Sequence, residues 1–397
     1  MIANEILVGS AYGELKKLPA GSVNCCVTSP PYWGLRDYGL PDTIFGGLHG
    51  CEHVWSEIRK PSANGAWDAM VGASKNLHSA TRRVTVSVSC VKCEAWRGQL
   101  GLEPDPALYV AHLVEIFRQV RRVLRNDGTI WVNLGDCWAT GAGSARIPGG
   151  KYGKQARAVD GSGYPTCQPN RMPINGLKSK DMVGIPWRVA FALQADGWYL
   201  RSDVIWEKPN VIPESVKDRP TKAHEYIFLL SKSKRYYYDG DSIREPMVES
   251  ERTRRLREQR QGLKTVYSMK RDTAHGMHRP GSGGCVRSVE ARHRLALLGT
   301  RNKRTVWKVS TTPFKGAHFA TFPEALVRPC ILAGSPPGGV VLDPFVGAGT
   351  VPLVALKTDR KFIGIELNAE FAEIAMARLT PFMNGGGPAA VLPKQSS

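Results

Sequence analysis

Five consecutive residues near the N-terminus, Thr28-Ser29-Pro30-Pro31-Tyr32, combine hydrogen-bond acceptors with an aromatic ring. The Ser29 hydroxyl and the Pro30 carbonyl can both accept a hydrogen bond from an amine. The two prolines fix φ near about −65°, which stiffens the loop and aims these acceptors at one point. The Tyr32 ring offers a surface on which a planar base can stack. The pattern therefore suits a reaction at an amino nitrogen.

A second segment, Asp343-Pro344-Phe345-Val346-Gly347-Ala348-Gly349-Thr350, has the composition of a ligand-binding turn. Its glycines follow the apolar run 340–342, and a turn without side chains lets the backbone approach a ligand closely. Glu366 ends the next expected strand, where a carboxylate can accept hydrogen bonds from both ribose hydroxyls of a nucleoside. A dinucleotide-binding turn would have a third glycine where this chain has Pro352, so the pattern disfavours NAD.

In this order, the two segments resemble the catalytic and cofactor loops of the beta group of DNA amino-methyltransferases, the DNA methylases specific for cytosine N4 or adenine N6. The order is informative, because that group has a permuted arrangement with the catalytic loop first. The resemblance covers about residues 3–38, 105–136, 181–240 and 316–380, about half of the chain. It implies that S-adenosyl-L-methionine (AdoMet) is the cofactor and that double-stranded DNA is the partner.

The resemblance also implies which residues form the site. Catalysis is expected from Ser29, Pro30, Pro31 and Tyr32. AdoMet is expected to contact Asp343, Pro344, Phe345, Gly347, Gly349, Thr350, Glu366, Asn368, Phe322 and Pro323. In the family, the segment corresponding to 318–323 closes over the methionine end of AdoMet, and the carboxylate at the position of Glu366 holds the ribose. The chain departs from the family at Gly9-Ser10, where an aspartate often follows the glycine and helps to hold the adenine ring.

The implied reaction is a direct in-line transfer of the sulfonium methyl to an exocyclic amino nitrogen of a base flipped out of the duplex. Ser29 favours cytosine N4, because Ser-Pro-Pro loops in the family lean toward that target and Asp-Pro-Pro loops toward adenine N6. An adenine N6 enzyme is the alternative. An RNA methyltransferase and a catalytically inactive DNA-binding protein are less favoured, because the chain has a long basic insertion and intact motifs.

Methylation at cytosine C5 is excluded, because that chemistry needs a thiolate in the loop that follows the catalytic strand. The Pro329-Cys330 pair instead falls within an expected helix. Cys25 and Cys26 fall inside the apolar strand 23–28, where cysteine is usually inert filling.

Four further residues have the types and spacing of a metal site: Cys51, His53, Cys90 and Cys93. The second pair has the Cys-x-x-Cys spacing of a zinc knuckle. Both pairs lie in the stretch 45–100, whose weak apolar pattern gives it little core of its own, and a metal would supply the missing stability. The sequence therefore predicts a structural zinc ion in an insertion.

The net charge of +19 favours a polyanionic partner. Residues 251–308 contain sixteen Lys and Arg against four Asp and Glu, which is +12 of that total. DNA target recognition is therefore expected from 241–312. The nine cysteines and the lack of a secretory signal favour a reducing cytoplasm, and no apolar run is long enough to span a membrane. A cognate restriction endonuclease and the oligomeric state are left open.

The patterns predict one doubly wound α/β domain with a mostly parallel sheet, the Rossmann-like fold of AdoMet-dependent methyltransferases, assembled from both chain ends. The catalytic half is expected over 1–240, the AdoMet-binding half over 313–382 and a flexible tail over 383–397. Strands are expected at 4–9, 23–28, 129–134, 198–206, 224–230, 340–342 and 362–365, and helices at 11–18, 105–125, 185–195, 350–356 and 369–379.

Overall fold

The computed structural model describes residues 3–34, 40–48, 50–59, 86–139, 177–211, 213–254, 256–257, 299–311 and 322–383. It divides into two compact units: Met1–Tyr237 together with Thr305–Ser397, and Tyr238–Arg304. Both ends of the chain therefore belong to the same unit. The expected flexible tail lies outside the described residues, apart from its first residue, Met383.

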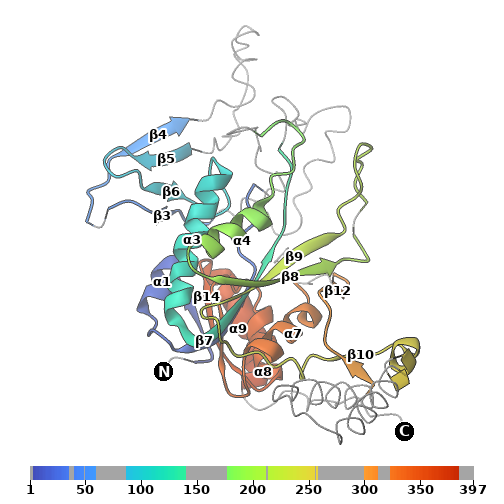
Figure 1. Ribbon diagram of the computed structural model, residues 1–397. Coiled ribbons are helices and arrows are strands. Elements are labelled where there is room, and N and C mark those ends of the chain that lie inside the picture. The colour runs from blue at the N-terminus through green and yellow to red at the C-terminus, as the bar shows by residue number, and fades with distance from the viewer. Residues whose placement is uncertain are drawn as a thin grey trace, which may run out of the picture. The chain divides into compact units, whose positions relative to one another are not determined.

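A mixed eight-stranded sheet runs through the first unit in the order β1-β14-β13-β2-β7-β9-β8-β12 (Figure 1). The strands are β1 (Glu5–Val8), β14 (Lys361–Glu366), β13 (Val340–Asp343), β2 (Val23–Thr28), β7 (Leu124–Leu134), β9 (His224–Ser231), β8 (Tyr199–Glu207) and β12 (Val306–Lys308). Neighbouring strands are parallel except where β9 pairs with β7 and with β8. The mostly parallel α/β fold predicted from the sequence is confirmed.

Helices cover both faces of this sheet. On one side α1 (Ala11–Lys17) and α4 (Ile185–Ala195) pack against α3 (Pro106–Val123). On the other side α7 (Glu324–Gly334) and α9 (Ala369–Met383) pack against α8 (Thr350–Lys357) (Figure 1). Double coverage explains why the central strands read as continuous apolar runs rather than alternating ones.

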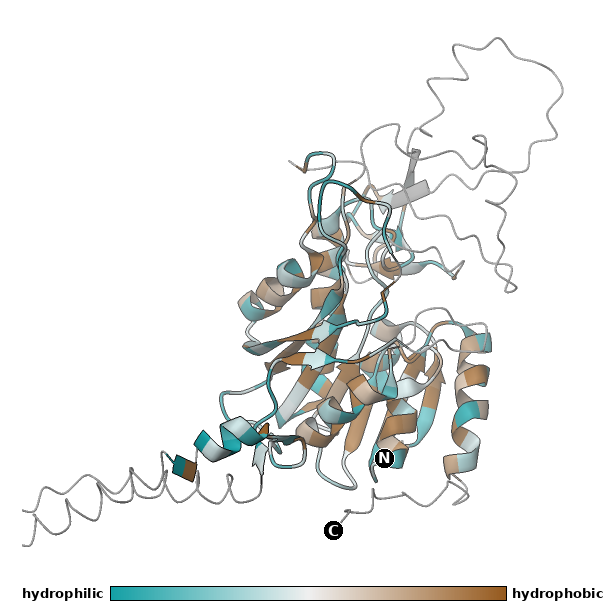
Figure 2. Cartoon of the chain, turned by 90° about the vertical axis from the view of Figure 1, so that its right-hand side faces the viewer, coloured by the Kyte–Doolittle hydropathy of each residue, from teal (hydrophilic) through white to brown (hydrophobic). Residues whose placement is uncertain are grey.

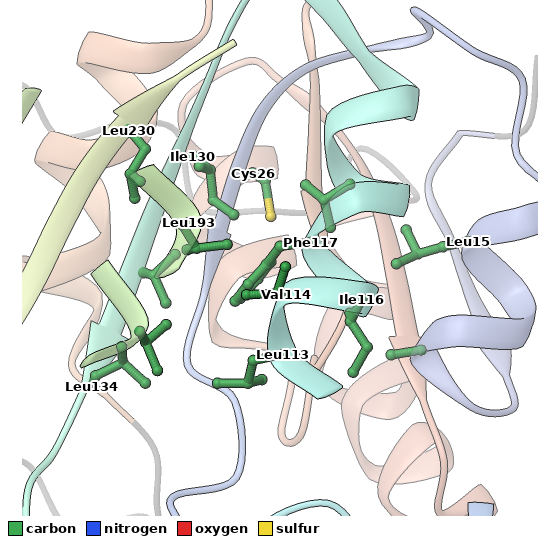
Figure 3. Packing of buried hydrophobic residues seen from close by; sticks show 14 of the residues in the cluster. Leu15, Cys26, Leu113, Val114, Ile116, Phe117, Ile130, Leu134, Leu193 and Leu230 are labelled. Atoms are coloured by element: carbon green, nitrogen blue, oxygen red, sulfur yellow. The ribbon is translucent and has the colours of Figure 1, made fainter. Parts of the chain in front are cut away.

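The two cysteines of β2 show the two faces. Cys26 belongs to the hydrophobic cluster that α3 forms with the sheet, and Figure 3 shows it beside Phe117. Cys25 faces the opposite way: a Cβ added at Gly334 of α7 would lie 2.5 Å from its Sγ. Both thiols are fully buried, and burial raises the pKa of Cys25 to about 12. Their expected role as core filling fits this environment.

The main difference from the expected elements lies at the end of α3. Asp105 caps its start by accepting a hydrogen bond from the Ala107 amide at 2.6 Å. The helix ends at Val123 instead of residue 125, and β7 begins directly at Leu124. Residues 124–128, which precede the expected strand 129–134, are an irregular first part of β7, where its register against β2 shifts.

The insertion contains a second, antiparallel sheet of order β3-β6-β5-β4 that the sequence analysis did not predict. Its strands are β3 (Thr43–Phe45), β6 (Trp96–Gly98), β5 (Val86–Cys90) and β4 (Trp55–Arg59). Phe45 and Trp96 are buried within the main hydrophobic cluster. This sheet is therefore attached to the core of the large sheet through aromatic side chains.

The second unit contains a short ladder in which β10 (Glu245–Pro246) pairs with β11 (Thr300–Arg301). Arg301 contacts the carboxylates of both Glu245 and Glu251. Strand β12 falls inside the range 241–312 expected for target recognition, yet it pairs with β8 in the large sheet. The large sheet therefore includes the last part of that range.

Hydrophobic residues are concentrated in the strands and in the helix faces that pack on them (Figure 2). No helix in the part of the chain that the structure describes is long and apolar enough to cross a membrane.

Candidate functional site

The two predicted loops meet because their strands are neighbours. β2 ends at Thr28 and β13 ends at Asp343, and the strands run parallel side by side. The Thr28 hydroxyl donates a 2.7 Å hydrogen bond to Asp343 Oδ1, and both side chains are buried. Residues 315 positions apart in sequence are thus joined at the carboxyl edge of the sheet. Ligands of open α/β sheets bind outside this edge.

The segment after β13 is a tight glycine turn leading into α8. Gly347 and Gly349 have φ of 49° and 79°, in the left-handed region that favours glycine. A Cβ at Gly349 would lie 3.1 Å from the Ala375 Cβ of α9. The Phe345 amide donates to Asp343 Oδ1 at 3.1 Å. Glycine therefore allows the left-handed backbone of this turn and, at Gly349, its close packing against α9.

Glu366 ends β14, beside this turn. Its Oε2 accepts from the Gly347 amide at 2.9 Å and its Oε1 from the Asn368 amide at 3.0 Å. Burial raises the pKa of Asp343 to about 7 and outweighs the hydrogen bonds from Thr28 and Phe345, which lower it. Burial also raises the pKa of Glu366. The turn thus holds two enclosed carboxyl groups, an environment that favours a cationic ligand.

The remaining residues assigned to the cofactor lie around this turn. Asn368 caps α9, because its Oδ1 accepts from the Glu370 amide at 2.8 Å. Pro323 caps the start of α7, and Thr350 begins α8. Pro344 is buried within the turn. Most of the segment expected to close over the methionine end, 318–321, lies outside the described residues.

Phe322 lines a small cavity between α7 and the sheet. Thr28 and Asn133 line the same cavity, together with the Trp131 ring. The expected cofactor residue Phe322 and the end of β2, which leads into the expected catalytic loop, therefore face one space.

The loop expected to be catalytic is connected to β7 and β9 by a polar network. The Ser29 hydroxyl lies 3.3 Å from Asn133 Oδ1 and 3.4 Å from the Tyr32 hydroxyl. That tyrosine hydroxyl lies 2.9 Å from Asn133 Oδ1 and 2.8 Å from Glu225 Oε2, and it can donate to one of them at a time. Burial and the nearby Glu225 carboxylate raise the pKa of Tyr32 well above its ordinary value. Tyr32 is therefore a neutral donor.

Glu225 is the centre of this network. It also accepts from Asn133 Nδ2 at 3.1 Å and forms an ion pair with Lys208. Lys208 Nζ in turn lies 4.2 Å from the centre of the Trp206 ring. Sequence reasoning missed Asn133 and Glu225, and it gave no individual role to Lys208. Polar residues inside the apolar strands 129–134 and 224–230 were the available signal.

The loop is also fixed from its other side. The Tyr109 hydroxyl of α3 donates to the Pro31 carbonyl at 2.7 Å. A Cβ at Gly135 would lie 2.5 Å from the Tyr32 ring, so only glycine leaves room for that ring. The ring expected to stack on a base is thus held with its hydroxyl pointing into the polar network.

The structure also shows the surroundings of Ser10 and of the four predicted metal ligands. Ser10, the residue that departs from the family pattern, caps α1 by accepting from the Gly13 amide at 3.1 Å. The four predicted metal ligands of the insertion converge, with all their ligand atoms within 4.8 Å of one another.

The chain matches the DNA methylase family (N6_N4_Mtase) over residues 23–377. It is 40% identical over 371 residues to Type II methyltransferase M.Cfr9I of Citrobacter freundii, covering 94% of this chain and 86% of that protein. It is 38% identical to Type II methyltransferase M.SmaI of Serratia marcescens, covering 94% and 90% of the two chains. The structure resembles PvuII DNA methyltransferase (cytosine-N4-specific) with a TM-score of 0.50, at 14% identity over 97% of this chain and 92% of that one. The chain belongs to the DNA methylase family, and it is an AdoMet-dependent DNA methyltransferase that acts on exocyclic amino groups.

Proposed function

We propose that this enzyme methylates the N4 amino group of cytosine in double-stranded DNA, with Ser29 as the residue that contacts the target amine. The observation that carries the proposal is the position of Ser29. It directly follows Thr28, whose hydrogen bond to Asp343 brings the catalytic loop to the AdoMet-binding turn. The choice of cytosine over adenine rests on the serine itself, in the family context of Ser-Pro-Pro loops.

The proposed reaction needs no covalent enzyme intermediate. The exocyclic amine is a poor nucleophile because its lone pair is delocalised into the ring. The Ser29 hydroxyl and the Pro30 carbonyl accept hydrogen bonds from its two N–H groups and shift the nitrogen toward tetrahedral geometry. The nitrogen attacks the methyl carbon, the carbon–sulfur bond breaks, and S-adenosylhomocysteine leaves. The extra proton on the nitrogen then passes to water.

The polar network gives the loop its fixed geometry. Lys208 holds Glu225, and Glu225 holds the Asn133 amide and the Tyr32 hydroxyl. Asn133 Oδ1 then orients the Ser29 hydroxyl. We assign positioning roles to Asn133 and Glu225, because they act on the substrate through Ser29 and Tyr32.

AdoMet is assigned to the turn between β13 and α8. The sulfonium cation suits a site with two enclosed carboxyl groups, Asp343 and Glu366. Glu366 also holds the Gly347 amide, so a ribose bound to this carboxylate would lie directly on the glycine turn.

Sequence recognition is assigned to 241–312, mainly the unit Tyr238–Arg304. Its support is charge, since residues 251–308 contribute +12 to the net charge of +19. The similar Type II methyltransferases support a role in protecting a recognition sequence from a cognate restriction endonuclease.

Nucleoside mass spectrometry tests the target base. The full-length protein is incubated with AdoMet and unmethylated DNA of mixed sequence, and the DNA is then digested to nucleosides. We expect N4-methylcytosine, with none when AdoMet is omitted. N6-methyladenine would overturn the cytosine assignment while keeping the cofactor and the reaction type.

Replacing Ser29 with alanine tests its role. We expect turnover to fall about 10²–10³-fold, the range seen when one preorganised hydrogen-bonding group is removed. AdoMet affinity, measured by calorimetry, should stay within about twofold, because Ser29 contacts the catalytic side of the site. Ser22→Ala is a matched control, since that hydroxyl donates to the Pro19 carbonyl away from the site. Equal loss of turnover and AdoMet affinity in Ser29→Ala would contradict the assignment.

AdoMet binding should depend on pH through Asp343. Its pKa of about 7 in the free protein means that the carboxyl is largely protonated near about pH 6. The bound sulfonium favours the ionised form, so binding releases a proton and tightens as pH rises from about 6 to about 8. Calorimetry in buffers of different ionisation enthalpy measures this release. Asp343→Asn should remove most of the dependence, and an unchanged dependence in that variant would exclude Asp343 as its source.

A further inference from the structure

Three cysteines and one histidine of the insertion come together at one point. Cys51 and His53 precede β4, Cys90 is the last residue of β5, and Cys93 lies in the turn before β6. Cys51 Sγ lies 4.0 Å from Cys90 Sγ, and Cys93 Sγ lies 3.4 Å from His53 Nδ1. All four ligand atoms lie within 4.8 Å of one another.

These separations match a tetrahedral zinc site. With Zn–S bonds of about 2.3 Å and Zn–N bonds of about 2.0–2.1 Å, tetrahedral geometry places two sulfurs about 3.8 Å apart and a sulfur and a nitrogen about 3.5 Å apart. The sulfur–sulfur distance of 4.0 Å and the sulfur–nitrogen distance of 3.4 Å in the cluster are close to these two values. A disulfide would use two of the four residues and leave the convergence of the other two unexplained.

The backbone around the cluster is also shaped for metal ligands. The Lys92 amide lies 3.4 Å from Cys90 Sγ and donates to it, as in a Cys-x-x-Cys knuckle around a metal-bound thiolate. Glu94 follows with a φ of 60°, so the chain turns sharply after Cys93. A Cβ at Gly47 would lie 2.9 Å from Cys93 Sγ, so a glycine is needed where that loop approaches the cluster.

We propose that Cys51, His53, Cys90 and Cys93 bind one structural Zn²⁺ ion that holds the insertion sheet together. Four protein ligands fill a tetrahedral shell and leave no open position for catalysis. The ion joins the loop before β4 to the turn between β5 and β6. It therefore connects segments that are separated by a long stretch of chain.

The zinc-bound turn leads directly into the core of the methyltransferase. Trp96 follows Cys93 closely, and its ring lies 5.2 Å from that of His112 on α3. The Phe45 ring stacks on the His112 ring as well, with the two ring centres 4.5 Å apart. His112 Nδ1 lies 2.9 Å from the buried Glu103 carboxylate. The insertion is thus anchored to α3 by packed rings and a buried polar pair.

From there the contacts reach the catalytic loop. The Glu103 carbonyl accepts from Trp33 Nε1 at 3.0 Å, and the Gly101 carbonyl accepts from the Gly34 amide at 2.8 Å. Trp33 and Gly34 directly follow Tyr32. The ion therefore stabilises the segment 96–103 on which the end of the catalytic loop rests. Any effect of the ion on turnover rests on the proposed function, whereas the metal site itself does not.

Metal analysis of the full-length protein tests the site. Purified protein should contain about one zinc per chain, and Co²⁺ in its place should give the visible bands and thiolate charge-transfer absorption of a tetrahedral site. Cys93→Ser should lose the metal. Lys92→Ser, a matched control at an exposed position inside the same knuckle, should keep it. His53→Cys should also keep it, because four thiolates bind zinc.

A folded protein that contains no zinc and gives no cobalt spectrum would overturn the proposal, as would a Cys93→Ser protein that retains a full equivalent. The link to the catalytic loop has its own readout. Hydrogen exchange in Cys93→Ser should increase in 96–103 and in 31–34, and turnover should fall by up to about 10²-fold through misplacement of the loop. AdoMet affinity should be unchanged. Metal loss with unaltered exchange in both segments would contradict the link while leaving the zinc site intact.

Discussion

The site depends on one contact between the two ends of the chain, the hydrogen bond from Thr28 to Asp343 across the strands β2 and β13. Because these strands are parallel neighbours, the loops that follow them open at the same edge of the sheet. The contact is favoured because burying the Asp343 carboxyl group without a hydrogen-bond partner would cost free energy. The loop proposed to be catalytic and the turn proposed to bind AdoMet are thereby held in a fixed relation.

Two electrostatic arrangements flank this contact and serve different purposes. On the side proposed for AdoMet, burial raises the pKa of Asp343 and Glu366, an environment that favours a cationic ligand. On the substrate side, Lys208 already neutralises Glu225. The charges of Lys208 and Glu225 therefore compensate each other, and the hydrogen bonds of Glu225 and Asn133 orient Tyr32 and Ser29. The difference in charge suits a cationic methyl donor facing a neutral base.

Much of the fold could be predicted from the sequence because its elements have clear local signals. The strand 23–28 and the helix 185–195 have the predicted bounds, since each is an apolar segment with definite ends. Asn133 could not be placed, because its proximity to Ser29 depends on β7 pairing in parallel with β2. Glu225 could not be placed, because its proximity to the loop depends on β9 running antiparallel to β7. That reversal brings the start of β9 to the edge where β2 and β7 end. The insertion strands were missed because they are short and are supported by distant residues such as His112.

Calorimetry of AdoMet binding in a double-mutant cycle at Thr28 and Asp343 tests the joining of the two loops most directly. Thr28→Val keeps the shape of the side chain and removes its hydroxyl, which lies on the catalytic strand. It should weaken AdoMet binding about tenfold in the otherwise unaltered protein, and it should have little further effect when Asp343→Ala is already present. Equal losses in both backgrounds would show that the two residues act independently, and would contradict the account.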